Sequence, residues 1–123
     1  MGVFGDTRGA VALFTRASAA QTGASAVNGP DLPVGGLRAL AIDINVTALA
    51  GTAPSLSVRL ERKGTDGVYY PAWTGAAITA VGKQSVSLGA GQTALVLGDK
   101  VRLVTTVAGT TPSVTYSMSV QGE

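Results

Sequence analysis

The strongest constraint on the fold of this chain is the alternation of apolar and polar side chains between residues 40 and 47. Large apolar residues occupy the even positions, and small or polar residues the odd positions, of the run Leu40-Ala41-Ile42-Asp43-Ile44-Asn45-Val46-Thr47. A β-strand turns successive side chains to opposite faces, so a period of two residues is typical of a strand with one buried face. The run therefore predicts a half-buried strand that organises the fold.

A second alternating run follows after a turn that contains Gly51 and Pro54. Apolar residues stand at every second position of the segment Leu56-Ser57-Val58-Arg59-Leu60-Glu61. Two alternating runs separated by a short turn are typical of a β-hairpin. We predict that residues 40–47 and 56–61 pair with each other and present one continuous apolar face to the core.

Six further segments have strand character, and no segment has convincing helical periodicity. They are residues 11–16, 68–74, 77–81, 85–88, 101–107 and 114–120, the last two as a terminal hairpin. Short strands separated by Gly- and Pro-rich turns are typical of sandwiches and barrels. We predict an all-β protein, with a single antiparallel β-sandwich of jelly-roll or Ig-like type and about eight short strands.

The two predicted hairpins share an internal repeat. The sequence Ala50-Gly51-Thr52-Ala53-Pro54-Ser55 recurs as Ala108-Gly109-Thr110-Thr111-Pro112-Ser113. Either the hairpins are related across the sandwich, or both use the same favourable turn. A four-residue loop at the first copy would pair Leu49 with Pro54. Keeping Val46 on the core face then requires a β-bulge near Thr47 and Ala48.

Residues 1–36 differ from the sandwich domain at 37–123 and are predicted to form an extended N-terminal arm with one short strand. Residues 17–26 contain no large apolar side chain, and turn sequences follow at 28–31 and 33–36. Such a segment cannot offset a backbone ordering entropy of about 1–2 kcal/mol per residue unless it lies against another surface. We therefore expect residues 17–36 to contact sister copies or a larger lattice.

The composition excludes several classes of function. The chain has neither Cys nor His, which removes disulfides, thiol catalysis, most zinc sites and the usual general base. The net charge is only +2 and the basic residues are scattered, so we expect no nucleic-acid partner. The sequence shows no secretory signal and no stretch long and apolar enough to span a membrane. We also expect no cofactor, metal or small-molecule substrate.

Carboxylates are the remaining catalytic groups, and most of them stand in turns or loops. Asp43 and Glu61 alone lie on predicted strands, both on the polar face. Paired carboxylates perform glycoside hydrolysis, but they need a cleft that a chain of 123 residues has little material to build. We therefore predict that the two residues are solvated and that the protein is not an enzyme.

The strand at 68–74 carries three aromatic residues, Tyr69, Tyr70 and Trp73. Tyr and Trp are common in interface hot spots and sugar-stacking platforms, and they also fill small cores. By alternation Tyr69 and Trp73 share a face, and we favour a core position for this pair. Pro71 cannot donate to a ladder, which predicts an edge strand or a bulge here.

Three segments resemble small β-sandwich proteins from the structural modules of tailed bacteriophages, and capsid decoration (cement) proteins match best in size and character. They are residues 40–47, 60–70 and 110–120. The resemblance implies a non-enzymatic virion protein, made in the bacterial cytoplasm. It further implies that the protein binds the major capsid protein on the capsid surface and its own sister copies, with a trimer favoured. The resemblance has no motif that assigns a functional residue.

Two other functions remain open, a phage tail or baseplate β-module and a small carbohydrate-binding β-sandwich. A decoration protein should bind empty shells, a tail module should co-purify with tails, and a sugar binder should show a change in Trp73 fluorescence with glycan. For an assembly function we expect contacts through apolar residues of the arm and the aromatic strand, namely Val11, Leu13, Phe14, Val27, Leu32 and Tyr70.

Overall fold

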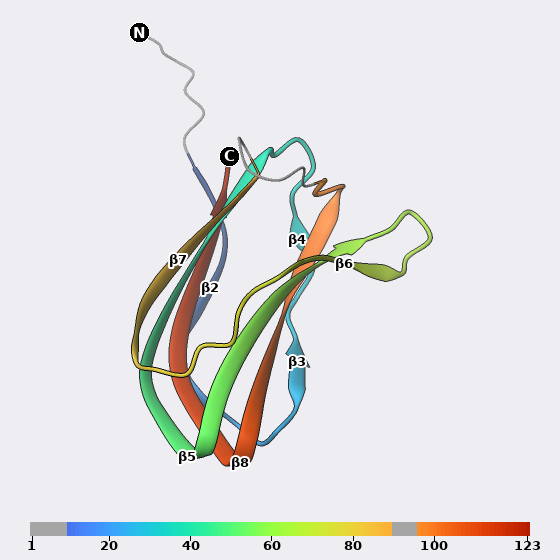
Figure 1. Cartoon of the computed structure of the whole chain (residues 1–123). Coiled ribbons are helices and arrows are strands. Elements are labelled where there is room, and N and C mark those ends of the chain that lie inside the picture. The colour runs from blue at the N-terminus through green and yellow to red at the C-terminus, as the bar shows by residue number, and fades with distance from the viewer. Residues whose placement is uncertain (1–9, 90–95) are drawn as a thin grey trace, which may run out of the picture.

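The computed structural model describes residues 10–89 and 96–123, and these residues form one antiparallel sheet of seven strands (Figure 1). The strands are β2 (Val11–Thr22), β3 (Ala26–Asn28), β4 (Leu32–Pro33), β5 (Ala39–Lys63), β6 (Tyr69–Thr74), β7 (Gly82–Gly89) and β8 (Lys100–Gly122). The predicted antiparallel all-β class is confirmed. The described chain does not, however, form two separate sheets of short strands; it forms a single sheet that is folded over and not closed.

Two long strands, β5 with 25 residues and β8 with 23, are the frame of the sheet. They pair with each other along their whole length, from Leu40 opposite Gly122 to Arg62 opposite Val101. Figure 1 shows that both strands bend in the middle, so that each runs down one side of the molecule and returns on the other. The predicted pairing of residues 40–47 with 56–61 is therefore wrong, as is the terminal hairpin.

Each predicted hairpin is instead an arch, and the internal repeat makes the two bends. Thr52 pairs with Thr110, and Ala50 pairs with Ser113. The two copies of the repeat therefore face each other in antiparallel register, related by a local two-fold axis. The two turns have similar sequences and pair directly with each other.

The backbone at the bends requires glycine. Gly51 and Gly109 have φ angles of 103° and 126°, and Ala53 and Thr111 also have positive φ. A Cβ atom on Gly51 would lie 2.6 Å from the carbonyl oxygen of Thr111, and one on Gly109 would lie 2.8 Å from that of Ala53. A side chain at either glycine would thus collide with the backbone of the other bend.

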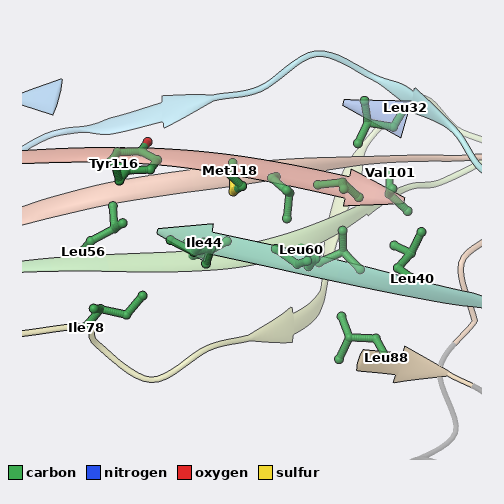
Figure 2. Packing of buried hydrophobic residues seen from close by; sticks show 14 of the residues in the cluster. Leu32, Leu40, Ile44, Leu56, Leu60, Ile78, Leu88, Val101, Tyr116 and Met118 are labelled. Carbon is green, nitrogen blue, oxygen red and sulfur yellow. The ribbon is translucent and has the colours of Figure 1, made fainter. Parts of the chain in front are cut away.

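The bends divide the sheet into two layers with one core between them (Figure 2). The first layer contains one arm of β5, the part before residue 51, and one arm of β8, the part after residue 112. β7 lies beside this part of β5, and β2 lies beside this part of β8. The second layer contains the other two arms, flanked by β6 on one side and by β3 and β4 on the other.

The predicted core face of β5 is confirmed. Its members are at most 3% exposed and are Leu40, Ile42, Ile44, Val46, Leu56, Val58 and Leu60. The predicted bulge is also present, because the register shifts between Val46 and Ala48. The residue opposite Leu49 is Val114 of β8, however, and not Pro54.

The described part of the predicted arm lies within the chain's own sheet. β2 pairs with the C-terminal arm of β8, whereas β3 and β4 pair with its N-terminal arm. Leu32 and Val34 are 4% and 0% exposed and belong to the core. Residues 17–36 are therefore ordered by β8, whose outer edge would otherwise lack hydrogen-bond partners, and they do not leave the domain as an arm. Residues 1–9 lie outside the described residues.

In the described part of the chain, the aromatic strand β6 pairs with β5 and with no other strand, and the register shifts next to Pro71, as the proline predicts. This bulge changes which face each aromatic residue occupies. Trp73 is opposite Leu60 and packs against the core, whereas Tyr69 is opposite Lys63 on the outer face. The predicted core position is thus wrong for Tyr69. The strand predicted at 77–81 is reduced to an isolated bridge between Leu56 and Ile78.

Candidate interaction surfaces

The side of the folded sheet between β2 and β3 holds a groove of about 400 Å³, here called the edge groove. Phe14 is half-buried and Val27 is 47% exposed at its sides, while Leu103 and Met118 of the core lie beneath them. The groove exists because β2 and β3 pair with different arms of β8, so that the two strands end up in different layers. Of the described residues that line it, Arg16 is the charged one.

A buried polar network closes one end of the edge groove. The Gln21 side chain is 7% exposed overall and accepts hydrogen bonds from the Tyr116 hydroxyl (2.7 Å) and the Thr105 hydroxyl (3.1 Å). Its amide nitrogen donates to the Thr105 carbonyl at 3.1 Å. Because Thr105 and Tyr116 belong to different layers, Gln21 ties the two layers together. Sequence reasoning missed this role, since an isolated Gln in a polar run has no distinctive pattern.

Arg16 covers the same end of the groove from outside. Its guanidinium lies 3.9 Å from the centroid of the Tyr116 ring, and it donates to the carbonyl oxygens of Tyr116 and Ala19. These bonds lie at the register shift between Arg16 and Ala19 in β2. Arg16 is thus occupied by its own strand and by β8.

The outer face of the second layer carries a charged cluster around Glu61. Arg59 and Arg102 each form an ion pair with the Glu61 carboxylate at 2.9 Å. Burial alone would raise the pKa of Glu61, but the hydrogen bonds from Arg102 and Arg59 outweigh it and keep the pKa below its ordinary value of 4.5. Glu61 is only 8% exposed, so the prediction that it is a solvated residue is wrong.

The same cluster extends to the loop before β4. The Tyr69 hydroxyl and the Lys63 ammonium both donate to the Asp31 carboxylate, the latter at 3.2 Å, and Arg102 lies 3.6 Å from the centroid of the Tyr69 ring. The hydrogen bond from Tyr69, followed by that from Lys63, lowers the pKa of Asp31, and the same contact raises the pKa of Tyr69. The cluster therefore fastens β6 to the loop at Asp31.

The outer face of the first layer forms a wider, shallow groove of about 460 Å³, here called the polar face. Its side chains lie in cross-strand rows, with Ser119 opposite both Thr15 and Asp43, and Asp43 opposite Ser85. The Ser85 hydroxyl donates to Asp43 at 2.6 Å. Asp43 and Glu61 thus lie on the outer faces of different layers, and the structure does not bring these two carboxylates together.

The three aromatic residues of β6 do not form a stacking platform. Trp73 packs against the core and lies so close to Gly75 that a Cβ there would be 2.7 Å from its ring. Tyr69 packs under Arg102, and Tyr70 donates to Asp66 at 2.6 Å. This hydrogen bond lowers the pKa of Asp66 and raises that of Tyr70.

The predicted contact residues are distributed over several parts of the surface. Phe14 and Val27 both line the edge groove, although they lie on different strands. Val11 is 50% exposed at the start of β2, Leu13 is half-buried, and Tyr70 is exposed on β6. Leu32, in contrast, is part of the core, because β4 pairs with β8 and turns this side chain inward.

Within residues 10–89 and 96–123, no group of three or more acidic residues is placed to hold a metal ion. The same residues contain no helix that could cross a membrane.

No family model and no curated protein matches the chain. Among solved structures, the chain is similar to the crystal structure of the SPBc2 prophage-derived protein YomS, with a TM-score of 0.47 and 14% sequence identity over 94% of both chains. A likeness of this size does not bear on function.

Proposed function

We propose that the protein is a non-enzymatic assembly protein that binds another protein surface through the edge groove. The observation that carries the proposal is that Phe14 and Val27, from different strands, line one groove together with the core residues Leu103 and Met118. Exposed apolar side chains grouped around a concave surface are typical of protein interaction sites. Among the described residues that line the groove, Arg16 is the charged one, and its guanidinium already donates to backbone carbonyl groups, so a partner need not supply acceptors for those hydrogen bonds.

The state of the carboxylates supports a non-enzymatic role. Glu61 is held between two arginines, Asp31 accepts from Tyr69 and Lys63, and Asp43 lies on the opposite outer face from Glu61. A glycoside hydrolase needs two carboxylates facing one another across a sugar-sized gap.

The more specific part of the proposal comes from the resemblance found in the sequence. We propose that the protein is a capsid decoration protein of a tailed bacteriophage, located on the virion surface, with the major capsid protein and sister copies as partners and a trimer as the favoured oligomer. A small β-sheet protein without disulfides suits assembly in a bacterial cytoplasm.

Substitution of one groove residue tests this proposal. We expect Val27→Asp to weaken binding to purified empty heads at least tenfold in a co-sedimentation assay, because the carboxylate would have to be buried in an apolar contact. The matched control is Val68→Asp, since Val68 is similarly exposed at 51% but lies on the loop before β6. Full binding by Val27→Asp would refute the edge groove as the binding site.

The same assay separates the phage alternatives. Tails purified from the same phage serve as the second binding surface. Binding to tails and not to heads would support the tail or baseplate module and overturn the decoration role, while binding to neither particle would overturn the virion function altogether.

The polar face favours carbohydrate binding as a second candidate function. Its hydroxyl, amide and carboxylate groups, including Asp43, Asn45 and Ser117, are the groups that hydrogen-bond to sugar hydroxyls. Calorimetric titration with a panel of bacterial surface glycans tests it. Heat release that Asp43→Asn abolishes would support this function, and no heat release with any glycan would eliminate it for that panel.

A further inference from the structure

The edges of the sheet differ in how well they are protected against pairing with another chain. An exposed strand edge is a template for a further strand, and proteins block it with bulges, proline, charge or very short strands. The β6 edge contains Pro71 and a register shift, and β3 and β4 are two or three residues long with Pro33 in β4. The β2 edge is interrupted by two register shifts, one of them filled by Arg16.

The β7 edge carries none of these devices along most of its length. Its eight residues, Gly82–Gly89, pair with β5 in unbroken register and contain no proline. Its one charged residue, Lys83, stands next to the end of the strand. β7 pairs with β5 and with no other strand in the described part of the chain, and Figure 1 shows its far side uncovered by other strands.

We propose that β7 pairs antiparallel with β7 of a second copy of this chain, across a two-fold axis centred on Val86. This contact would join the first layers of two copies into one continuous sheet. The inference rests on the proposed assembly role for its biological meaning, but it concerns a different edge from the edge groove. Since a strand cannot pair with itself about a three-fold axis, a trimer would use other surfaces and β7 would join two trimers.

The side chains of β7 favour a second copy as the occupant. Residues opposite each other in an antiparallel pair have side chains on the same face of the sheet. The two-fold axis between two β7 strands must therefore pass through a residue and not between two residues. The two residues at the middle of β7 are Ser85 and Val86. Centring on Val86 places this half-buried valine against its equivalent and pairs Gln84 with Leu88, whereas centring on Ser85 places Val86 against Gln84. Apolar cross-strand pairs are the more stable ones. Lys83 then faces Gly89, so the single charge of the edge does not meet itself.

A single introduced cysteine tests the contact, because the natural chain has none. Directly opposed residues in an antiparallel pair have Cα atoms about 4.5–5.5 Å apart, which suits a disulfide. We expect purified Val86→Cys to form a covalent dimer under mild oxidation. The control is Val68→Cys, which is 51% exposed but lies on the loop before β6. A Val86→Cys variant that stays monomeric, or that links no faster than Val68→Cys, would overturn the proposal.

Charge substitutions test the register without touching the core. Ser85 and Ser87 are exposed, and they face each other in the register centred on Val86. We expect the combination of Ser85→Lys with Ser87→Lys to weaken self-association at least tenfold in analytical ultracentrifugation, because lysines would oppose each other. Ser85→Lys with Ser87→Glu should restore it, since opposite charges would then face. Equal dimerisation by both double variants would contradict the contact.

The two proposals can fail separately. Self-association is measured on the isolated protein, whereas the proposed function is measured on heads and tails. A protein that binds heads but remains monomeric at all concentrations overturns the β7 contact and leaves the edge groove in place. A protein that dimerises through β7 but binds neither particle overturns the assembly role and leaves the β7 contact.

Discussion

The environment of Glu61 cannot be read from its position in the sequence. Alternation places Glu61 on the polar, outward face of its strand, yet Arg59 and Arg102 pair with it and it is only 8% exposed. Removing one partner from such a group leaves the other charges without compensation, which costs more than the pair itself contributes. Glu61 therefore acts as a junction between β5 and β8 on the outer face of the second layer.

We predict that Glu61→Gln lowers the free energy of unfolding by about 1–3 kcal/mol at pH 7. Because the folded-state pKa of Glu61 is lowered, its contribution is present above its ordinary pKa of 4.5 and disappears as the pH falls through the folded value. The stabilities of the natural protein and the variant should thus converge in acid. Urea unfolding between pH 3 and pH 7 measures this, and a gap that stays constant over that range would contradict it.

The element that determines the architecture is the arch, a strand that bends and continues in a second layer without pairing with itself. β5 and β8 are two such arches placed side by side, and each supplies the hydrogen-bond partners of the other. The bend of β5 must therefore lie directly opposite the bend of β8. The two copies of the repeat make this possible, since the glycine of each bend lies close to the backbone of the opposite bend.

We predict that Gly51→Ala, and likewise Gly109→Ala, destabilises the protein by at least about 1–3 kcal/mol, from the positive φ and the contact with the opposite bend. The control is Ala53→Gly, because Ala53 has a φ of 51°. This substitution relieves a left-handed alanine and should leave stability unchanged or raise it by about 1 kcal/mol. Equilibrium urea unfolding gives both values, and unchanged stability of Gly51→Ala would show that the bend tolerates a side chain.

At the scale of the whole molecule, β8 is the strand that holds the N-terminal strands in the sheet. β2, β3 and β4 all pair with its outer edge, and residues that are distant in the sequence, such as Leu40 and Gly122, are neighbours. A protein with so many distant contacts is expected to fold slowly, because its loops must close before the contacts form.

Deletion of residues 1–36 tests this dependence. An extended arm could be removed without loss of the fold, but this deletion removes the core residues Leu32 and Val34. It also removes β2, β3 and β4, the three strands that pair with the outer edge of β8. We expect the shortened protein to lose its cooperative thermal transition, monitored by circular dichroism. A shortened protein that unfolds cooperatively near the natural melting temperature would show that the sheet does not need these strands.

The sequence by itself determined which side chains of β5 face the core. The alternation at residues 40–46 and 56–60 is a local property of the strand, and each of these apolar residues is buried as predicted. The bulge near Thr47 is present as predicted, but it was expected from a pairing of Leu49 with Pro54, whereas it lies in the pairing of β5 with β8. The placement of Pro71 at a register shift in an edge strand has the same local origin.

Only the tertiary structure decided which strand lies beside which. Alternation fixes the face of a side chain but carries no information about the partner strand, so a hairpin and an arch have the same pattern. The burial of Glu61, the position of Tyr69 and the role of Gln21 all depend on neighbours supplied by β8 or by the loop at Asp31. Which distant segments pair through hydrogen bonds depends on the packing of the whole chain. Local periodicity limits this pairing only by determining which face of each strand is buried.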